Sequence, residues 1–235
     1  MHYPDFENLI SAPRMSRYLS ACKDDTKKAM TLYRANLQLS QELFSILSIF
    51  EEVLRNKIDS HYKSVFHPII GNEDWPIYAA SPGGFYDNGS TSKTRTSILK
   101  AKSNLGENYT HNKLLAELNF GFWRFQFGPK EFRAAGSNLH QIFVKRSHGT
   151  NHTSIFNRLQ LINKLRNRIA HHEPICFDIS QNTISNKYAI DHFDEIITLL
   201  RWMDISHKAL FYGINGVSRE IAFLNNLNYN DVSAV

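Results

Sequence analysis

Residues 24–66 read DDTKKAMTLYRANLQLSQELFSILSIFEEVLRNKIDSHYKSVF. The stretch contains neither glycine nor proline, and its apolar residues recur at helical spacing, at Leu32, Leu39, Leu43, Phe44, Leu47, Phe50, Leu54 and Ile58. This periodicity predicts α-helix with one apolar face. We expect two helices in series, with Ser40 able to cap the second.

The rest of the chain repeats this helical character on both sides of one interruption. Residues 67–92 are rich in Gly, Pro, Asn and Ser and predict a long loop. Further helical patterns follow at residues 94–105, 112–127, 138–145, 153–172 and 189–211. The segment near 175–187 is β-branched and turn-like, which predicts a short extended stretch. The fold class is therefore all-α, a helical bundle within a single domain over residues 1–235.

Composition limits the classes of protein to consider. Hydrophobic residues make up 42% of the chain and charged residues 21%, which is typical of a globular protein and excludes a disordered tail. The two cysteines, Cys22 and Cys176, have no metal-ligand spacing and fit a reducing compartment. No secretory leader pattern and no membrane-length apolar run is present. We expect a cytoplasmic protein that does not bind membranes.

The net charge of +5 is unevenly distributed. Residues 130–172 contain eight Lys or Arg and a single acid, Glu131, whereas residues 173–235 contain eight acids and four bases. A local excess of positive charge favours a polyanionic partner. The middle of the chain is thus the first place to look for nucleic-acid binding.

One short phrase occurs twice. Leu54-Arg55-Asn56-Lys57-Ile58 precedes His61, and Leu165-Arg166-Asn167-Arg168-Ile169 precedes His171 and His172. Arg166 falls inside or beside the apolar stripe of its helix, where an unpaired charge is costly. It is either a structural arginine, bonded to a carboxylate such as Glu51 or to helix-end carbonyls, or a phosphate-binding group that works with a proton-shuttling histidine.

The second phrase resembles the R-x(4–6)-H signature of the HEPN superfamily. Beyond this motif the chain resembles the Abi-like (abortive infection) branch of that superfamily over about residues 10–205. The resemblance lies in Leu32-Tyr33 with Asn36 and Leu39-Ser40, Glu51 with Leu54-Arg55-Asn56, residues 116–123 (AELNFGFW), and residues 165–175 (LRNRIAHHEPI). It implies an all-α HEPN-like bundle, with N-terminal helices over residues 12–66 and a HEPN core over about 94–212.

The resemblance also assigns roles to residues. Arg166 and His171 match the catalytic pair, and Asn167, His172 and Glu173 match the supporting positions of the same run. Glu51, Arg55, Asn56 and His61 form a possible second motif, in which Arg55 is more often structural than catalytic. Glu173 stands where many HEPN toxins with nucleotidyltransferase antitoxins carry a tyrosine, which weakens any expectation of regulation by tyrosine modification.

The implied activity is metal-independent cleavage of single-stranded RNA in bacterial phage defence or a toxin–antitoxin system, with no cofactor. Arg166 stabilises the phosphate while His171 transfers protons, and a 2′,3′-cyclic phosphate results. The implied partners are RNA or a protein antitoxin. The composite site forms either in a homodimer from two Arg166/His171 pairs or within one chain from Arg55/His61 and Arg166/His171. A non-catalytic RNA- or protein-binding module is the alternative.

Several other residues are candidates for binding RNA. Basic side chains that could contact its backbone are Lys145, Arg146, Arg158, Lys164 and Arg168, and a second cluster at Lys93, Arg95, Lys100 and Lys102. The second cluster is about as consistent with an ordinary solvated helix face. The aromatic run over residues 120–127 predicts core, with one exposed ring possible. No metal ligand set is expected, because His148 and His152 lack a third partner.

Overall fold

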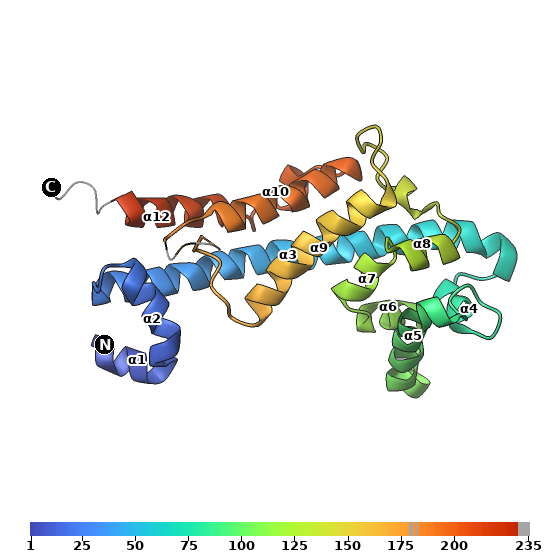
Figure 1. Cartoon of the computed structure of the whole chain (residues 1–235). Helices are drawn as coiled ribbons and strands as arrows, with labels where there is room; N and C mark the ends of the chain where they lie inside the picture. Colours follow the sequence, from blue (N-terminus) through green and yellow to red (C-terminus); the bar gives the residue numbers. More distant parts are fainter. Residues whose placement is uncertain (179–180, 182, 230–235) are drawn as a thin grey trace. The chain divides into compact units, whose positions relative to one another are not determined.

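The computed structural model describes residues 1–178, 181 and 183–229, and its regular structure is helical (Figure 1). These residues contain no β-strand; one isolated antiparallel bridge pairs Phe177 with Ile184. The prediction of an all-α fold is therefore confirmed. The bridge lies in the segment for which the sequence predicts an extended stretch, of which residues 179–180 and 182 are outside the described residues.

The chain divides into two compact units. The first contains Met1–Ser48, Lys164–Ile197 and His207–Val235, and the second contains Ile49–Asn163 and Thr198–Ser206. Each unit is described separately below. The single domain expected over residues 1–235 stays a prediction.

The first unit begins with α1 (Tyr3–Ile10) and α2 (Ala12–Ala21), which pack against each other. Both helices carry a proline in their first turn, where the missing N–H group costs no hydrogen bond. The unit also contains the beginning of the 45-residue helix α3 (Thr26–Ile70) and the end of α9 (His152–Ala170). Most of α10 (Lys187–Trp202), α11 (His207–Leu210) and α12 (Val217–Tyr229) complete it.

Aromatic rings and one amide connect the parts of the first unit. The ring of Tyr18 packs edge-on against Tyr33 of α3, at 5.3 Å, and against Phe177, at 5.1 Å between centroids. The buried Asn36 side chain of α3 accepts a hydrogen bond of 2.8 Å from the backbone N–H of Ile175. Since a buried N–H group without a partner is costly, Asn36 fixes the segment that follows α9.

The second unit contains the end of α3 and a group of short helices. These are α4 (Trp75–Ala80), α5 (Ser92–Leu105), α6 (His111–Glu117), α7 (Phe120–Phe125) and α8 (Pro129–Ala134). The 3-10 turns η1 (Gly89–Thr91), η2 (Gly106–Asn108) and η3 (Leu139–Ile142) connect them. Figure 1 shows α5 with α4 and α6 beside it, and these helices are in contact.

Aromatic side chains form much of the core of the second unit. Tyr62 packs against Trp75, with 4.6 Å between ring centroids, and the hydroxyls of Tyr62 and Tyr86 both donate to the carboxamide oxygen of Gln126. Within the aromatic run, Phe125 is 43% exposed, whereas the buried rings are those of Phe120, Phe122, Trp123 and Phe127. The interpretation of this run as core with one exposed ring is confirmed.

Two predicted boundaries near α3 are wrong. The helix continues through Ser40 without a break, because buried Leu39 and Leu43 keep the apolar face continuous on both sides. It also continues past Pro68, since a proline in a last turn displaces few backbone hydrogen bonds. Gly71, with φ of 70°, ends it by donating to the carbonyl of His67 at 2.9 Å. The loop predicted over 67–92 is therefore shorter, and α4 and η1 lie within it.

Other predicted helices are also divided. The pattern over 112–127 forms α6 and α7, which are separated at Leu118 and Asn119. Residues 138–145 form only the 3-10 turn η3, and the pattern over 189–211 forms α10 and the short α11. Helix α12 lies outside the predicted helices, since its polar residues interrupt the apolar periodicity. Among the described residues, no helix is both long and apolar enough to cross a membrane.

Candidate active site

Helix α9 ends in a turn that includes Arg168, His172 and Glu173. The N–H of Glu173 donates to the carbonyl of Arg168 at 2.8 Å, and the N–H of His172 donates to that of Ile169 at 3.0 Å. This pair of bonds is the Schellman closure of a helix, whose left-handed residue is usually glycine. Here it is His172, with φ of 55°. A side chain in that backbone conformation is strained, and such strain often marks a functional position.

Arg166 lies near the end of α9, and His171 directly follows the last helical residue, Ala170. Arg166 is half-buried, and it makes no hydrogen bond or ion pair with any described residue of its unit. His171 is exposed, and its N–H donates to the carbonyl of Asn167 at 2.9 Å. Five residues of α-helix turn through about 140° beyond one full turn, so the two side chains leave the helix in different directions. The guanidinium of Arg166 can therefore bind an anion that is not part of this unit.

Arg168, by contrast, is held by its surroundings. Its Nε lies 3.3 Å from a carboxylate oxygen of Glu173, and its guanidinium lies over the ring of Tyr188, 4.9 Å from the centroid. Burial raises the pKa of Tyr188 above its usual value and lowers that of the neighbouring His192. The charges of Glu173 and Arg168 are therefore paired with each other at the helix end.

A surface hollow of about 430 Å³ lies beside this helix end, lined by Ser11, Pro13, Arg14, Arg17, Tyr18, His172, Glu173 and Pro174. Arg14 donates to the carbonyl of His172 at 3.1 Å. Arg17 donates to the carbonyl of Asp178 at 3.1 Å, and its guanidinium lies 4.4 Å from the centroid of the Phe177 ring. The hollow thus combines cationic side chains from α2 with the histidine turn.

Arg14 and Arg17 are not among the residues predicted from the sequence. Their spacing of three residues in α2 places them on the same side of the helix, while Met15 and Tyr18 are buried. That amphipathic pattern was the available signal. The connection from α2 to the end of α9 depends on tertiary structure, which sequence spacing does not reveal.

The copy of the phrase in α3, Leu54–Ile58, lies in the other unit and has different surroundings. Arg55 is half-buried without a hydrogen bond or ion pair among the described residues of that unit, Asn56 is exposed and Glu51 is half-buried. His61 Nε2 lies 2.8 Å from Oδ1 of Asn138, to which it donates. Helix α3 continues beyond His61 to Ile70, so this histidine lies within a helix rather than at its end.

The predicted RNA-binding residues belong to both units and have different surroundings. In the second unit Lys145 pairs with Asp204 at 2.6 Å, Arg146 donates to the carbonyls of His140 and Phe143, and Arg158 lies over the ring of Trp202. Arg95 pairs with Asp87 at 3.4 Å and donates to the carbonyl of Ala80. Lys164 and Lys102 are exposed. Lys93 and Lys100 line a cleft of the second unit, described below.

A partly buried polar network in the second unit was also not predicted. The two ring nitrogens of His111 face two carboxylates, with Nε2 2.8 Å from Asp59 and Nδ1 3.3 Å from Asp74. Trp75 and Lys63 also bond to Asp59, at 2.9 and 3.1 Å. Burial lowers the pKa of His111, but its hydrogen bonds to Asp59 and Asp74 outweigh this and raise the pKa to about 9. The imidazole is therefore positively charged at neutral pH.

The described residues contain no group of three or more His, Cys, Asp or Glu side chains arranged to hold a metal ion. Cys22 and Cys176 are buried and are not joined in a disulfide, and burial raises the pKa of Cys176 to about 12. Comparison with known proteins gives no match to this chain among protein-family models, curated proteins or solved structures.

Proposed function

We propose that this chain is a metal-independent endoribonuclease that cleaves single-stranded RNA with Arg166 and His171. The observation that carries the proposal is the half-buried guanidinium of Arg166, which makes no hydrogen bond or ion pair with the described residues of its unit and lies five residues before the exposed His171, next to the left-handed His172. A guanidinium without a carboxylate partner is suited to binding a phosphate through paired hydrogen bonds. Arg14 and Arg17 on the neighbouring hollow add positive charge that favours an approaching RNA strand.

In the proposed reaction, the 2′-hydroxyl of a ribose attacks the adjacent phosphorus. A histidine accepts the hydroxyl proton, the O2′–P bond forms, and the P–O5′ bond breaks while a second proton-carrying group protonates O5′. The products are a 2′,3′-cyclic phosphate and a 5′-hydroxyl. Arg166 stabilises the charge that develops on the non-bridging oxygens, and His171 serves as one of the two proton-transfer groups.

The geometry of α9 favours a site built from two copies of the chain. Because Arg166 and His171 leave the helix about 140° apart, they do not converge on one phosphate by themselves. In a homodimer, Arg166 of one copy meets His171 of the other, and two histidines then supply the base and the acid. The resemblance to the Abi-like branch supports a role in bacterial phage defence in the cytoplasm, with an antitoxin or an RNA as regulator.

The test is incubation of the purified protein with total RNA in EDTA. We expect cleavage by the wild type, with new 5′-hydroxyl ends that accept a kinase label, and losses of at least about 100-fold in Arg166→Ala and His171→Ala. Arg133→Ala and His148→Ala change exposed residues of the same basic stretch and serve as matched controls. Cleavage that persists in the Arg166 and His171 variants contradicts the proposal. RNA binding without cleavage under any activating condition favours the non-catalytic binding module instead.

A further inference from the structure

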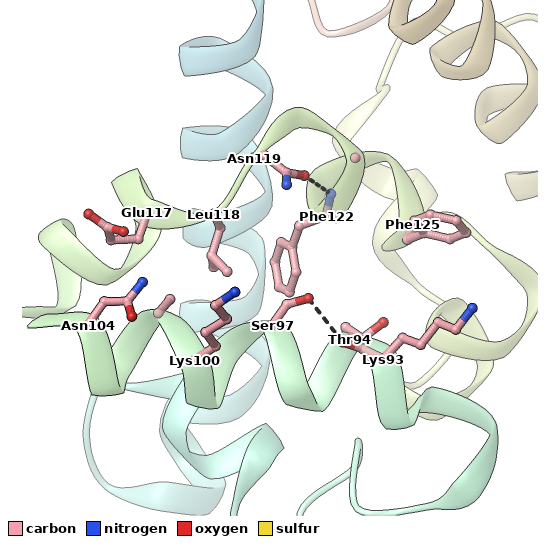
Figure 2. A pocket seen from close by; sticks show the side chains of 12 residues that line it. Lys93, Thr94, Ser97, Lys100, Asn104, Glu117, Leu118, Asn119, Phe122 and Phe125 are labelled. Atoms are coloured by element: carbon pink, nitrogen blue, oxygen red, sulfur yellow. Dashed lines mark hydrogen bonds between the residues drawn. The ribbon is translucent and has the colours of Figure 1, made fainter. Parts of the chain in front are cut away.

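The second unit contains a cleft that the proposed catalytic site does not use. It has a volume of about 460 Å³, within the range of small-molecule sites. Figure 2 shows α5 along one side of the cleft and the segment from Glu117 to Phe125 along the other. Lys93 and Phe125 lie toward one end, and Asn104 and Glu117 toward the other.

The cleft is open because the helical pattern over 112–127 breaks at Leu118. Asn119 then begins α7 by accepting a hydrogen bond from the N–H of Phe122 through Oδ1, at 3.0 Å. This bond orients the carboxamide, whose Nδ2 group donates to no described residue. Gly121 adds no side chain to this wall, where a Cβ atom would lie 3.0 Å from Oδ1 of Asn119. This wall of the cleft is therefore polar at Asn119 and carries no side chain at Gly121.

The α5 side of the cleft carries a positive charge. Lys93, Ser97, Lys100 and Asn104 follow one another at spacings of four, three and four residues, which places them on one helix face. The hydroxyl of Ser97 donates to the carbonyl of Lys93 at 3.0 Å. Both lysines are exposed and make no ion pair among the described residues, and among those lining the cleft Glu117 is the single acid.

An aromatic ring is held in place at the lysine end. Phe125 is 43% exposed although it belongs to a run that is otherwise core. The guanidinium of Arg124 lies 4.3 Å from the centroid of the Phe125 ring and 4.7 Å from that of Phe156. The two rings lie 5.8 Å apart, so the phenyl group of Phe125 packs against Phe156 as well as Arg124. An exposed ring that is packed in this way is a surface on which a planar base can stack.

We propose that this cleft binds a phosphorylated nucleoside, with its base stacked on Phe125 and its phosphate at Lys93 and Lys100. The side-chain amide of Asn119 and the hydroxyl of Ser97 also line the cleft, and they can form hydrogen bonds with the base edge or the ribose. A free nucleotide and one unit of a single-stranded RNA share this chemistry. The inference goes beyond the proposed cleavage, because the cleft lies in the other unit and its binding does not require Arg166.

The test measures the fluorescence anisotropy of a labelled uridine hexanucleotide in the Arg166→Ala background, where cleavage is removed. Uridine monophosphate, an abasic hexamer and inorganic phosphate are the competitors. Displacement by the monophosphate identifies a free nucleotide as ligand, and displacement by unlabelled hexamer alone identifies an RNA unit. An absence of binding, or displacement by the abasic strand as effective as by the hexamer, overturns the proposal.

Variants separate stacking from charge. Phe125→Leu should weaken binding about tenfold without changing its salt dependence, and Phe125→Tyr, which keeps the ring, should bind like the parent. Lys93→Gln and Lys100→Gln should each lower the slope of log affinity against log salt by about 0.7. Phe44→Leu and Lys113→Gln change an exposed ring and an exposed lysine elsewhere and should have no effect. Unchanged affinity in Phe125→Leu, or equal loss in Phe125→Tyr, overturns the assignment of the ring.

Discussion

The phrase leucine–arginine–asparagine–base–isoleucine stands in two helices that continue differently. In α3 the helix runs on from Arg55 to Ile70, and His61 on the way is bonded to Asn138. In α9 the helix ends at Ala170, directly after the phrase, and the chain turns at His172. The same residues are thus part of a packed helix in one place and of an exposed helix end in the other.

This difference shows what turns a motif into a candidate site. A histidine inside a helix that donates through Nε2 to a neighbouring amide, as His61 does, has one of its two ring nitrogens occupied by the fold. A histidine at a helix end projects into solvent, and the turn that follows brings in groups from another element, here Arg14 of α2. We therefore infer that the α9 copy acts on a substrate and that the α3 copy serves packing.

The largest expected effect is on RNA cleavage, and it appears when Arg166 and Arg55 are each replaced in a separate variant. Arg166→Ala should lower RNA cleavage by about 10²–10³-fold, because it removes the group that stabilises the transition-state charge. Arg55→Ala, at the matching position of α3, should leave cleavage within about threefold. Initial rates on a defined single-stranded RNA in EDTA give both values.

His61→Ala and His171→Ala extend the same comparison to the histidines. A loss of activity in His61→Ala as large as that in His171→Ala, with the fold intact by circular dichroism, would make the α3 copy part of a composite site within one chain. Unchanged activity in His61→Ala leaves the two-copy arrangement as the source of the second histidine.

A second prediction concerns the anchor of the α9 end. Asn36→Ala should lower the free energy of unfolding by about 2 kcal/mol, because the buried N–H of Ile175 loses its acceptor. Asn56→Ala removes an exposed asparagine from the α3 copy and should change stability by less than about 0.5 kcal/mol. Urea denaturation measures both, and equal values would show that Ile175 finds another acceptor.

A third prediction uses the network beside the α3 copy, where Asp59 holds His111. The pKa of His111 is about 9 in the folded chain and near 6.5 when unfolded, so folding favours the protonated imidazole. Its contribution is complete below about pH 6.5 and disappears as the pH rises toward 9. After allowance for solvent screening, we expect a loss of about 1–2 kcal/mol over that interval.

Denaturant titrations at pH 6 and pH 9 test this dependence. His111→Gln should remove most of the difference between the two pH values, while His67→Gln, at an exposed position of α3, should preserve it. A wild-type stability that rises between pH 6.5 and 9 would contradict a charged His111 in the network.

The fold class followed from local pattern, but several helix boundaries did not. Apolar residues at helical spacing identify α3, α5 and α9, because that periodicity is a property of the chain itself. Whether a helix continues through Ser40 or breaks at Leu118 depends on which faces are buried, and this is settled by tertiary contacts. Proline at position 68 illustrates the same point, since its cost depends on how much helix follows it.

The candidate site residues likewise include some that the sequence could indicate and some that it could not. Arg166, His171 and the lysines of the α5 cleft were within reach of sequence spacing and charge, and Phe125 was foreseen only as one ring of several. Arg14 and Arg17 lie far from α9 in sequence, and the network of Asp59, His111 and Asp74 joins three separate segments. Residues that meet only through the fold leave no periodic signal by which sequence could connect them.

The smallest expected effect tests the strain at the α9 helix end. His172→Gly should raise the free energy of unfolding by about 0.5–1 kcal/mol, because glycine adopts a φ of 55° without the steric cost that a side chain carries there. His171→Gly is the matched control: its backbone still belongs to the last helical turn, so it should lower stability by a similar amount. Chemical denaturation of the two variants gives opposite signs if His172 is strained. A loss of stability in both would mean that the His172 side chain stabilises the turn, and the contrast with the uninterrupted helix at Arg55 would then rest on packing alone.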